Sequence, residues 1–178
     1  MVNSFEDTSS WFKAGLVFII LALILDATGF SLPYFLEEWV NNSERWNSGL
    51  WQTCTRNGWR DVECTDSIFT DTGWFLGAKI LHCVGISTTI LTLIVSLILL
   101  IALTNSRLTN INVTICFTAL SAVGTGTLIC IKMLLITPEN TDFLHRYLGM
   151  SFYLCISATA SLLLAWIFLM IDQRKSNS

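Results

Sequence analysis

The chain has 178 residues, of which 53% are hydrophobic and only 13% are charged, and its mean hydropathy is +0.61. A soluble domain carries roughly 25% charged residues, so this composition argues against a soluble protein. The formal net charge is −3, and the basic residues do not cluster along one face in the way that nucleic-acid binding requires. The sequence therefore indicates an integral membrane protein and excludes nucleic acid as a partner.

Four apolar segments are long enough to cross the hydrocarbon core of a bilayer as helices, which takes about 20 residues. We expect these helices at about residues 14–36, 74–103, 111–136 and 147–171. The first segment is too long, and too interrupted by charge, for a cleaved signal peptide, so we expect it to be retained. Because no linker or repeat divides the chain, we expect residues 1–178 to form a single membrane domain.

Four crossings place both termini on one side of the membrane, and a long loop (residues 37–73) and a short loop (137–146) on the other. Arg107 lies in the connection between the second and third segments, and Arg174 and Lys175 lie in the tail. The positive-inside rule assigns these residues to the cytoplasm, although arginines in the opposite loops weaken that assignment. We expect a multi-pass plasma-membrane protein with both termini cytoplasmic.

The six cysteines fall into two groups. Two of them, Cys54 and Cys64, lie together in the long polar loop, which is too small to bury a core of its own. A disulfide is the expected clamp for such a loop, and it requires an oxidising compartment outside the cytoplasm. The glycosylation sequon at Asn41 agrees with an extracellular loop. We interpret the remaining four, all in apolar segments, as small buried hydrophobic side chains: Cys83, Cys116, Cys130 and Cys155.

The long loop also shows a pattern typical of β structure. Two stretches rich in Trp, Thr and Val, residues 51–56 and 59–64, flank the dipeptide Asn57-Gly58, which is a strong hairpin signal. A two-residue turn at this dipeptide would pair Cys54 with Asp61 and not with the second cysteine. Directly opposed cysteines need a turn of about three to five residues. We favour the wider turn, because the disulfide is the stronger constraint.

The most specific stretch, residues 46–54, reads Trp-Asn-Ser-Gly-Leu-Trp-Gln-Thr-Cys. Gly49 allows a tight bend, and Leu50 and Trp51 would point to opposite faces of a strand, so that one packs onto the helix ends and the other faces the sheet. Together with Cys64, this stretch resembles the signature of the claudin superfamily. That signature is a Trp, then Gly-Leu-Trp, then two cysteines in the first extracellular loop of a four-helix protein.

The resemblance covers essentially the whole chain, and either Trp39 or Trp46 supplies the earlier Trp of the signature. It implies a left-handed bundle of four transmembrane helices with a small extracellular antiparallel β-sheet in the first loop. The short interval from Trp39 to Trp51 looks more like the peripheral myelin and epithelial membrane protein branch. The Gly-Leu-Trp sequence is equally like true claudins and channel gamma subunits. The tail lacks the hydrophobic C-terminus with which junctional claudins bind scaffold domains.

Ionisable residues interrupt the apolar segments at a few positions. A charge at membrane depth is costly unless it is paired or wetted, so such residues suggest a functional site. Asp26, Lys79, His82 and Lys132 all fall in the outer half of the expected bundle. We predict that Asp26 pairs with Lys79 or Lys132, with His82 as a possible link between them. The alternative is that both lysines extend to the interface and that Asp26 is protonated or bonded to a hydroxyl.

The sequence carries no signature of an enzyme, because it lacks a metal-ligand cluster, a phosphate-binding glycine loop and a CxxC pair. We expect no catalytic residue, cofactor, bound metal or small-molecule substrate. The resemblance implies a cell-contact or membrane-organising protein that acts in adhesion or in a paracellular barrier of the tight-junction type. Its expected partners are the lipid bilayer and other copies of the same chain. The alternative is an auxiliary gamma-type subunit of a larger ion channel or receptor.

The long loop is acidic, which bears on any pore that it lines. If the loop lined a paracellular pore, its acids should attract cations, and the candidates are Asp61, Glu63, Asp66 and Asp71. The alternative interpretation is a solvated acidic surface without a transport role.

Overall fold

The structure is a computed structural model that describes residues 9–41, 44–57, 62–66, 73–101, 106–136 and 146–177. Four long helices dominate these residues: α1 (Ser10–Ser31), α2 (Gly73–Ile101), α3 (Ser106–Ile136) and α4 (Met150–Asn177). Each of them contains a segment that is long and apolar enough to cross a membrane. The chain therefore has the helices that were predicted for a multi-pass membrane protein.

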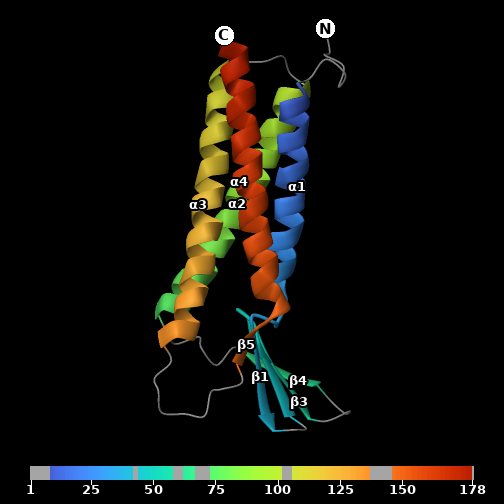
Figure 1. Ribbon diagram of the computed structural model, residues 1–178, viewed down its shortest axis with the longest axis vertical. Helices are drawn as coiled ribbons and strands as arrows, with labels where there is room; N and C mark the ends of the chain where they lie inside the picture. Colours follow the sequence, from blue (N-terminus) through green and yellow to red (C-terminus); the bar gives the residue numbers. More distant parts are fainter. Residues whose placement is uncertain are drawn as a thin grey trace.

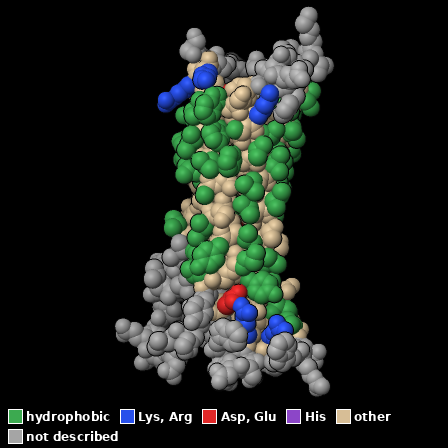
Figure 2. Space-filling view, turned by 45° about the vertical axis from the view of Figure 1, so that its right-hand side comes forward, with side chains coloured by type: hydrophobic (Ala, Val, Ile, Leu, Met, Phe, Trp, Pro, Cys, Tyr) green, Lys and Arg blue, Asp and Glu red, His purple; other side chains and the backbone are tan. Residues whose placement is uncertain are grey.

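The helices run side by side, and a small sheet lies at one end of the bundle (Figure 1). The first residues of α1 and the last residues of α4 lie at the opposite end. Apolar side chains cover the body of the bundle between the two ends, where a soluble protein would carry polar groups (Figure 2). Lys and Arg side chains lie at both ends of the bundle and not along its apolar body (Figure 2); α4 contributes Arg174 and Lys175 at the end that holds the chain termini.

The sheet consists of β1 (Leu36–Asn41), β2 (Glu44–Ser48), β3 (Gln52–Asn57), β4 (Val62–Asp66) and β5 (Arg146–Leu148). The strands are antiparallel in the order β4-β3-β2-β1-β5. The prediction of a small antiparallel sheet in the long first loop is therefore confirmed. It was incomplete, however, because the short loop before α4 supplies β5, which pairs with β1.

The helix boundaries differ from those predicted where polar caps and proline decide them. The first helix begins at Ser10, because the hydroxyl of Ser9 accepts a hydrogen bond from the backbone N–H of Trp11 at 3.2 Å. It ends at Ser31 and not near residue 36, because Pro33 disfavours a helical conformation at the residue before it. Hydropathy alone placed the end of this helix too late, because the residues that follow are equally apolar.

At the end that holds the chain termini, the last two helices extend further than hydropathy indicated. The predicted start of the last helix, residue 147, lies in β5, and α4 begins at Met150. It continues through Asn177, past the predicted end, and the ammonium group of Lys175 lies 5.5 Å from the centre of the Trp11 ring. Basic residues in a last turn also suit the helix dipole. The third helix begins at Ser106, five residues before its predicted start at Ile111.

Small and apolar side chains fill the bundle. α1 packs mainly along α4, and α2 mainly along α3. The prediction that the cysteines of the apolar segments are buried holds for Cys116, Cys130 and Cys155, but it is wrong for Cys83, which is exposed on the surface of α2. The core cluster nearest the sheet consists of Phe35, Leu50, Ala78, Cys130, Phe152 and Cys155.

Candidate functional site

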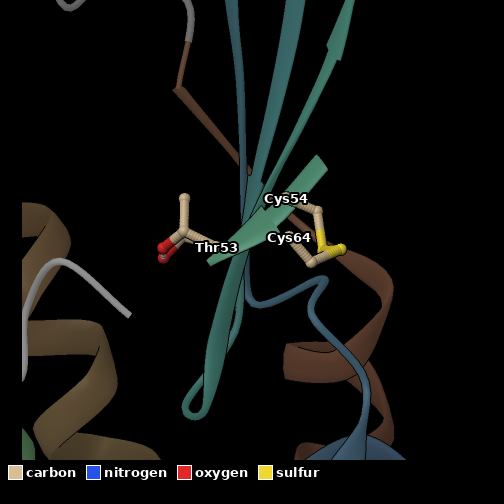
Figure 3. The surroundings of a disulfide bond; sticks show 4 residues. Thr53, Cys54 and Cys64 are labelled. Carbon is tan, nitrogen blue, oxygen red and sulfur yellow. Dashed lines mark hydrogen bonds between the residues drawn. A yellow bond between two sulfur atoms is a disulfide. The ribbon is translucent and has the colours of Figure 1, made fainter. Parts of the chain in front are cut away.

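The disulfide joins two neighbouring strands of the sheet. Cys54 in β3 lies directly opposite Cys64 in β4, and the two sulfurs are bonded, which confirms the predicted disulfide (Figure 3). The adjacent side chain, Thr53, points to the other face of the strand (Figure 3). The pairing of Arg56 with Val62 shows that the turn between these strands is the wider one, as favoured from the sequence. Of the second predicted stretch, the described part begins at Val62, and residues 59–61 lie outside the described residues.

Gly49 lies where the chain passes over the end of α1. A Cβ atom at this position would lie 2.5 Å from the Cα of Pro33 and 2.6 Å from the carbonyl oxygen of Leu32. The N–H of Gly49 donates a hydrogen bond of 2.8 Å to the carbonyl oxygen of Gln52, which closes the bend between β2 and β3. Glycine is therefore required by close contact with the backbone that leaves α1.

The residues after this glycine seat the sheet on the bundle. Leu50 and Trp51 lie in the bend and not in a strand, which corrects the predicted strand start at residue 51. Leu50 is 1% exposed and belongs to the core cluster nearest the sheet. The Trp51 ring meets the edge of Phe30 on α1, with 5.0 Å between centroids, and the Lys79 ammonium group lies 5.0 Å from its centre. Both residues therefore contact the helices, whereas the sequence suggested that only one would.

The sheet presents apolar and charged groups on its surface. Trp46 on β2 is 37% exposed and Val62 on β4 is 59% exposed. β4 is an edge strand, and all of its residues are exposed, including Glu63 and Asp66. The other two acids proposed to attract cations, Asp61 and Asp71, lie outside the described residues.

The disulfide face of the sheet carries an open hollow of about 210 Å³. Arg45, Asn47 and Arg56 contribute to its lining, together with both cysteines. Arg45 forms an ion pair with Glu37 across β1 and β2. The sheet therefore has a face that bears arginines and an edge strand that bears acids. The side chains of two further predicted residues, Trp39 and Asn41, are not described, although both lie in β1.

A buried polar contact lies inside the bundle near the sheet. Oδ1 of Asp26 on α1 lies 3.1 Å from Nδ1 of His82 on α2, and the two residues are 2% and 0% exposed. The His82 ring stacks on Phe30 at 5.9 Å between centroids. His82 thus lies beside Asp26. The predicted pairing of Asp26 with a lysine stays a prediction, because the ammonium group of Lys79 lies over Trp51 and the side chain of Lys132 is not described.

A third residue, Cys155 on α4, completes this buried group. One ligand atom from each of Asp26, His82 and Cys155 lies within 4.8 Å of the others, and Cys155 is 0% exposed. Gly29 on α1 makes room for the thiol, because a Cβ there would lie 2.9 Å from Sγ of Cys155. Carboxylate, imidazole and thiolate are all ligands of zinc in proteins. Cys155 was not recognised from the sequence, although it and Asp26 each lie five residues from the sheet end of their helices.

No protein-family model and no curated protein sequence matches this chain.

Proposed function

We propose that this chain is a non-enzymatic cell-contact protein of the claudin superfamily. In this proposal it resides in the plasma membrane with both termini in the cytoplasm, and its sheet meets the sheets of other copies outside the cell. The observation that carries the proposal is a disulfide-clamped sheet at one end of four membrane-spanning helices, with Trp46 and Val62 exposed on it. Function still has to be argued from such a surface, since a fold by itself does not fix it.

The residues of the Gly-Leu-Trp signature support the family assignment, because each has a structural task. Gly49 permits close contact with Pro33, Leu50 enters the core, and Trp51 covers Phe30. These contacts hold the sheet against the helix ends, so that the strands extend away from the bundle (Figure 1). A sheet held in this way can meet a facing membrane in one orientation, as adhesion requires.

The surface of the sheet supports contact between copies. Large exposed aromatic and apolar side chains favour protein–protein contacts, and the strand register places Trp46 on one face of the sheet and Val62 on the other. Arg56 lines the hollow on the disulfide face, while Glu63 and Asp66 lie on the edge strand. By the strand register Arg56 shares a face with Asp66, whereas Glu63 lies on the other face, and such separated opposite charges allow two copies to approach with complementary charge.

The proposal is tested in cells that form no junctions of their own. Two cell populations express the chain with different fluorescent tags, and the fluorescence at contacts between the two colours is compared with that at contacts with non-expressing cells. Enrichment is expected at contacts where both cells express the chain. Cys54→Ser should abolish this enrichment, because it opens the hairpin that carries the edge strand.

The matched control is Cys83→Ser, which removes an exposed free thiol on α2 that takes no part in the disulfide. This variant should behave like the unmodified chain. Equal staining of all surfaces, at matched surface expression, would contradict adhesion and would favour the alternative, an auxiliary subunit of a larger channel or receptor. Co-purification from those cells would then be used to identify the larger protein.

A further inference from the structure

We propose that Asp26, His82 and Cys155 bind one zinc ion inside the sheet end of the helix bundle. The three residues come from α1, α2 and α4, which the ion would therefore join at one point. This site is separate from the exposed surface of the sheet, and it does not rest on the adhesion proposal.

The distances are close to those of a zinc site. The three ligand atoms lie within 4.8 Å of one another, and Asp26 Oδ1 and His82 Nδ1 are 3.1 Å apart. Zinc bonds of about 2.0–2.3 Å to O, N and S place neighbouring ligands of a tetrahedron roughly 3.3–3.8 Å apart. Small side-chain rotations that shorten any longer separation would therefore complete the arrangement. Three protein ligands leave one position of the tetrahedron open.

One unused oxygen in the group points to a ligand. Among the described residues, Oδ2 of Asp26 is buried and has no hydrogen-bond partner; Nε2 of His82 also has none, but it faces Gly126 on α3, while Nδ1 faces Asp26. Buried side-chain polar atoms without a partner are uncommon, and each one calls for an explanation such as an ion. The carboxyl group of Asp26 therefore has an oxygen available for a metal, beyond the one that faces His82.

The charges also favour a divalent ion. An ionised carboxyl group at membrane depth is costly when nothing neutralises it. Zinc bound to one carboxylate, one thiolate and one neutral imidazole gives a formal charge of zero, so the cluster as a whole is neutral. The aromatic rings beside His82, Phe30 and Phe35, exclude water from this region and would strengthen the attraction between the ion and its ligands.

The site lies next to the core cluster on which the sheet rests. Cys155 belongs to the same core cluster as Phe35 and Leu50, and Leu50 is the signature residue that enters the bundle. An ion held by the three helices would therefore stabilise the surface on which the sheet rests. Metal binding of this kind couples to folding, because the ligands are brought together only in the folded chain.

The test uses the full chain, purified in detergent, stripped of metal with a chelator and titrated with Co²⁺ as a spectroscopic probe. We expect one Co²⁺ per chain, with a near-ultraviolet charge-transfer band from the thiolate, and Zn²⁺ should displace it. Cys155→Ser should abolish the band, and His82→Gln should weaken Co²⁺ binding by at least about ten-fold.

Two control variants separate this site from other ligands. Cys116→Ser removes a thiol that is equally buried but belongs to a different core cluster, and His145→Gln removes the second of the two histidines in the chain. Both variants should keep the band and the stoichiometry. A band that persists in Cys155→Ser, or an unmodified chain that binds no Co²⁺ with a thiolate band, would overturn the proposal.

A measurement on the unmodified chain covers the case in which the variants do not fold. Zn²⁺ should slow alkylation of Cys155 strongly and should leave alkylation of Cys116 unchanged, as measured by mass spectrometry of the digested protein. Zn²⁺ should also raise the thermal unfolding midpoint of the stripped chain, since a ligand that binds only the folded state stabilises it. Equal alkylation rates of Cys155 with and without Zn²⁺ would contradict the site.

Discussion

Nδ1 of His82 lies 3.1 Å from Oδ1 of Asp26, and this contact joins α2 to α1 at the end of the bundle that carries the sheet. Both residues are buried, so neither can exchange its partner for bulk water. The His82 ring also meets the edge of Phe35, at 6.3 Å between centroids, and Phe35 packs in the same cluster as Leu50. The polar contact therefore packs directly against the core cluster on which the sheet rests.

This contact predicts energetic coupling between the two residues. In a double-mutant cycle of Asp26→Ala and His82→Ala, measured by unfolding in mixed micelles with a metal chelator present, we expect a coupling energy of about 0.5–2 kcal/mol. Each single change leaves the other group buried without its partner, whereas the double change removes both. The matched control is a second cycle in which Thr28→Ala takes the place of Asp26→Ala. Thr28 is exposed on α1, and its hydroxyl donates a hydrogen bond to the carbonyl oxygen of Ile24 in the same helix. Additive effects of Asp26→Ala and His82→Ala would contradict the coupling.

The close contacts around Gly49 predict that this position tolerates no side chain. Gly49→Ala should lower the free energy of unfolding by about 1–3 kcal/mol, because the new methyl group meets the backbone at Pro33 and Leu32 and cannot rotate away. The measurement is thermal unfolding of the purified chain, together with the fraction that reaches the cell surface. The control is Gly77→Ala in α2, where no atom of another described residue is recorded within 4 Å of the added Cβ. Equal stability of the two variants would show that the contact at Pro33 is not limiting.

Glycosylation of Asn41 would report which side of the membrane the sheet occupies. It lies at the end of β1, which runs away from the bundle (Figure 1). If the sheet is outside the cell, an endoglycosidase should reduce the apparent mass of the chain, and Asn41→Gln should abolish this shift. Asn112 heads the other sequon, but it is 1% exposed inside α3, so Asn112→Gln should leave the shift unchanged. A shift that depends on Asn112 would reverse the proposed orientation.

The acids of the edge strand predict an effect on ion permeability if the chain forms paracellular pores. In an epithelial layer that expresses the chain, the double change Glu63→Gln and Asp66→Asn should lower the preference for Na⁺ over Cl⁻, because both acids are exposed on β4. The measurement is a dilution potential across the layer. Glu37→Gln is the control, because Glu37 is paired with Arg45 and lies on β1, which β2 and β3 separate from the edge strand β4. Anion selectivity of the unmodified layer would contradict a cation pore.

Hydropathy was sufficient to predict four membrane-spanning helices, because each span needs about 20 apolar residues and few other structures satisfy that requirement. The Cys54–Cys64 disulfide and the width of its turn could also be predicted, since two cysteines in one small polar loop have few other roles. Helix ends were predicted less well. Apolar residues continue past Pro33 into β1, so composition did not mark the boundary that proline sets.

The features that were missed depend on contacts between distant parts of the chain. β5 is three residues long and has no strand pattern of its own, so only its pairing with β1 defines it. Cys155 resembled any other small apolar residue of α4, and its place beside Asp26 depends on how α1 packs along α4. Asp26 and His82, by contrast, could be recognised as candidates, because ionisable residues within apolar segments are rare.

Adhesion through the clamped sheet is tested most directly with the purified chain alone. Two vesicle populations with different lipid dyes carry the full chain and no other protein, and energy transfer between the dyes reports contact between vesicles. We expect transfer to rise with the density of the chain and to fall to the level of protein-free vesicles for Cys54→Ser, while Cys83→Ser matches the unmodified chain. Vesicles that do not associate with the intact chain, or that associate equally with Cys54→Ser, would contradict adhesion through this sheet.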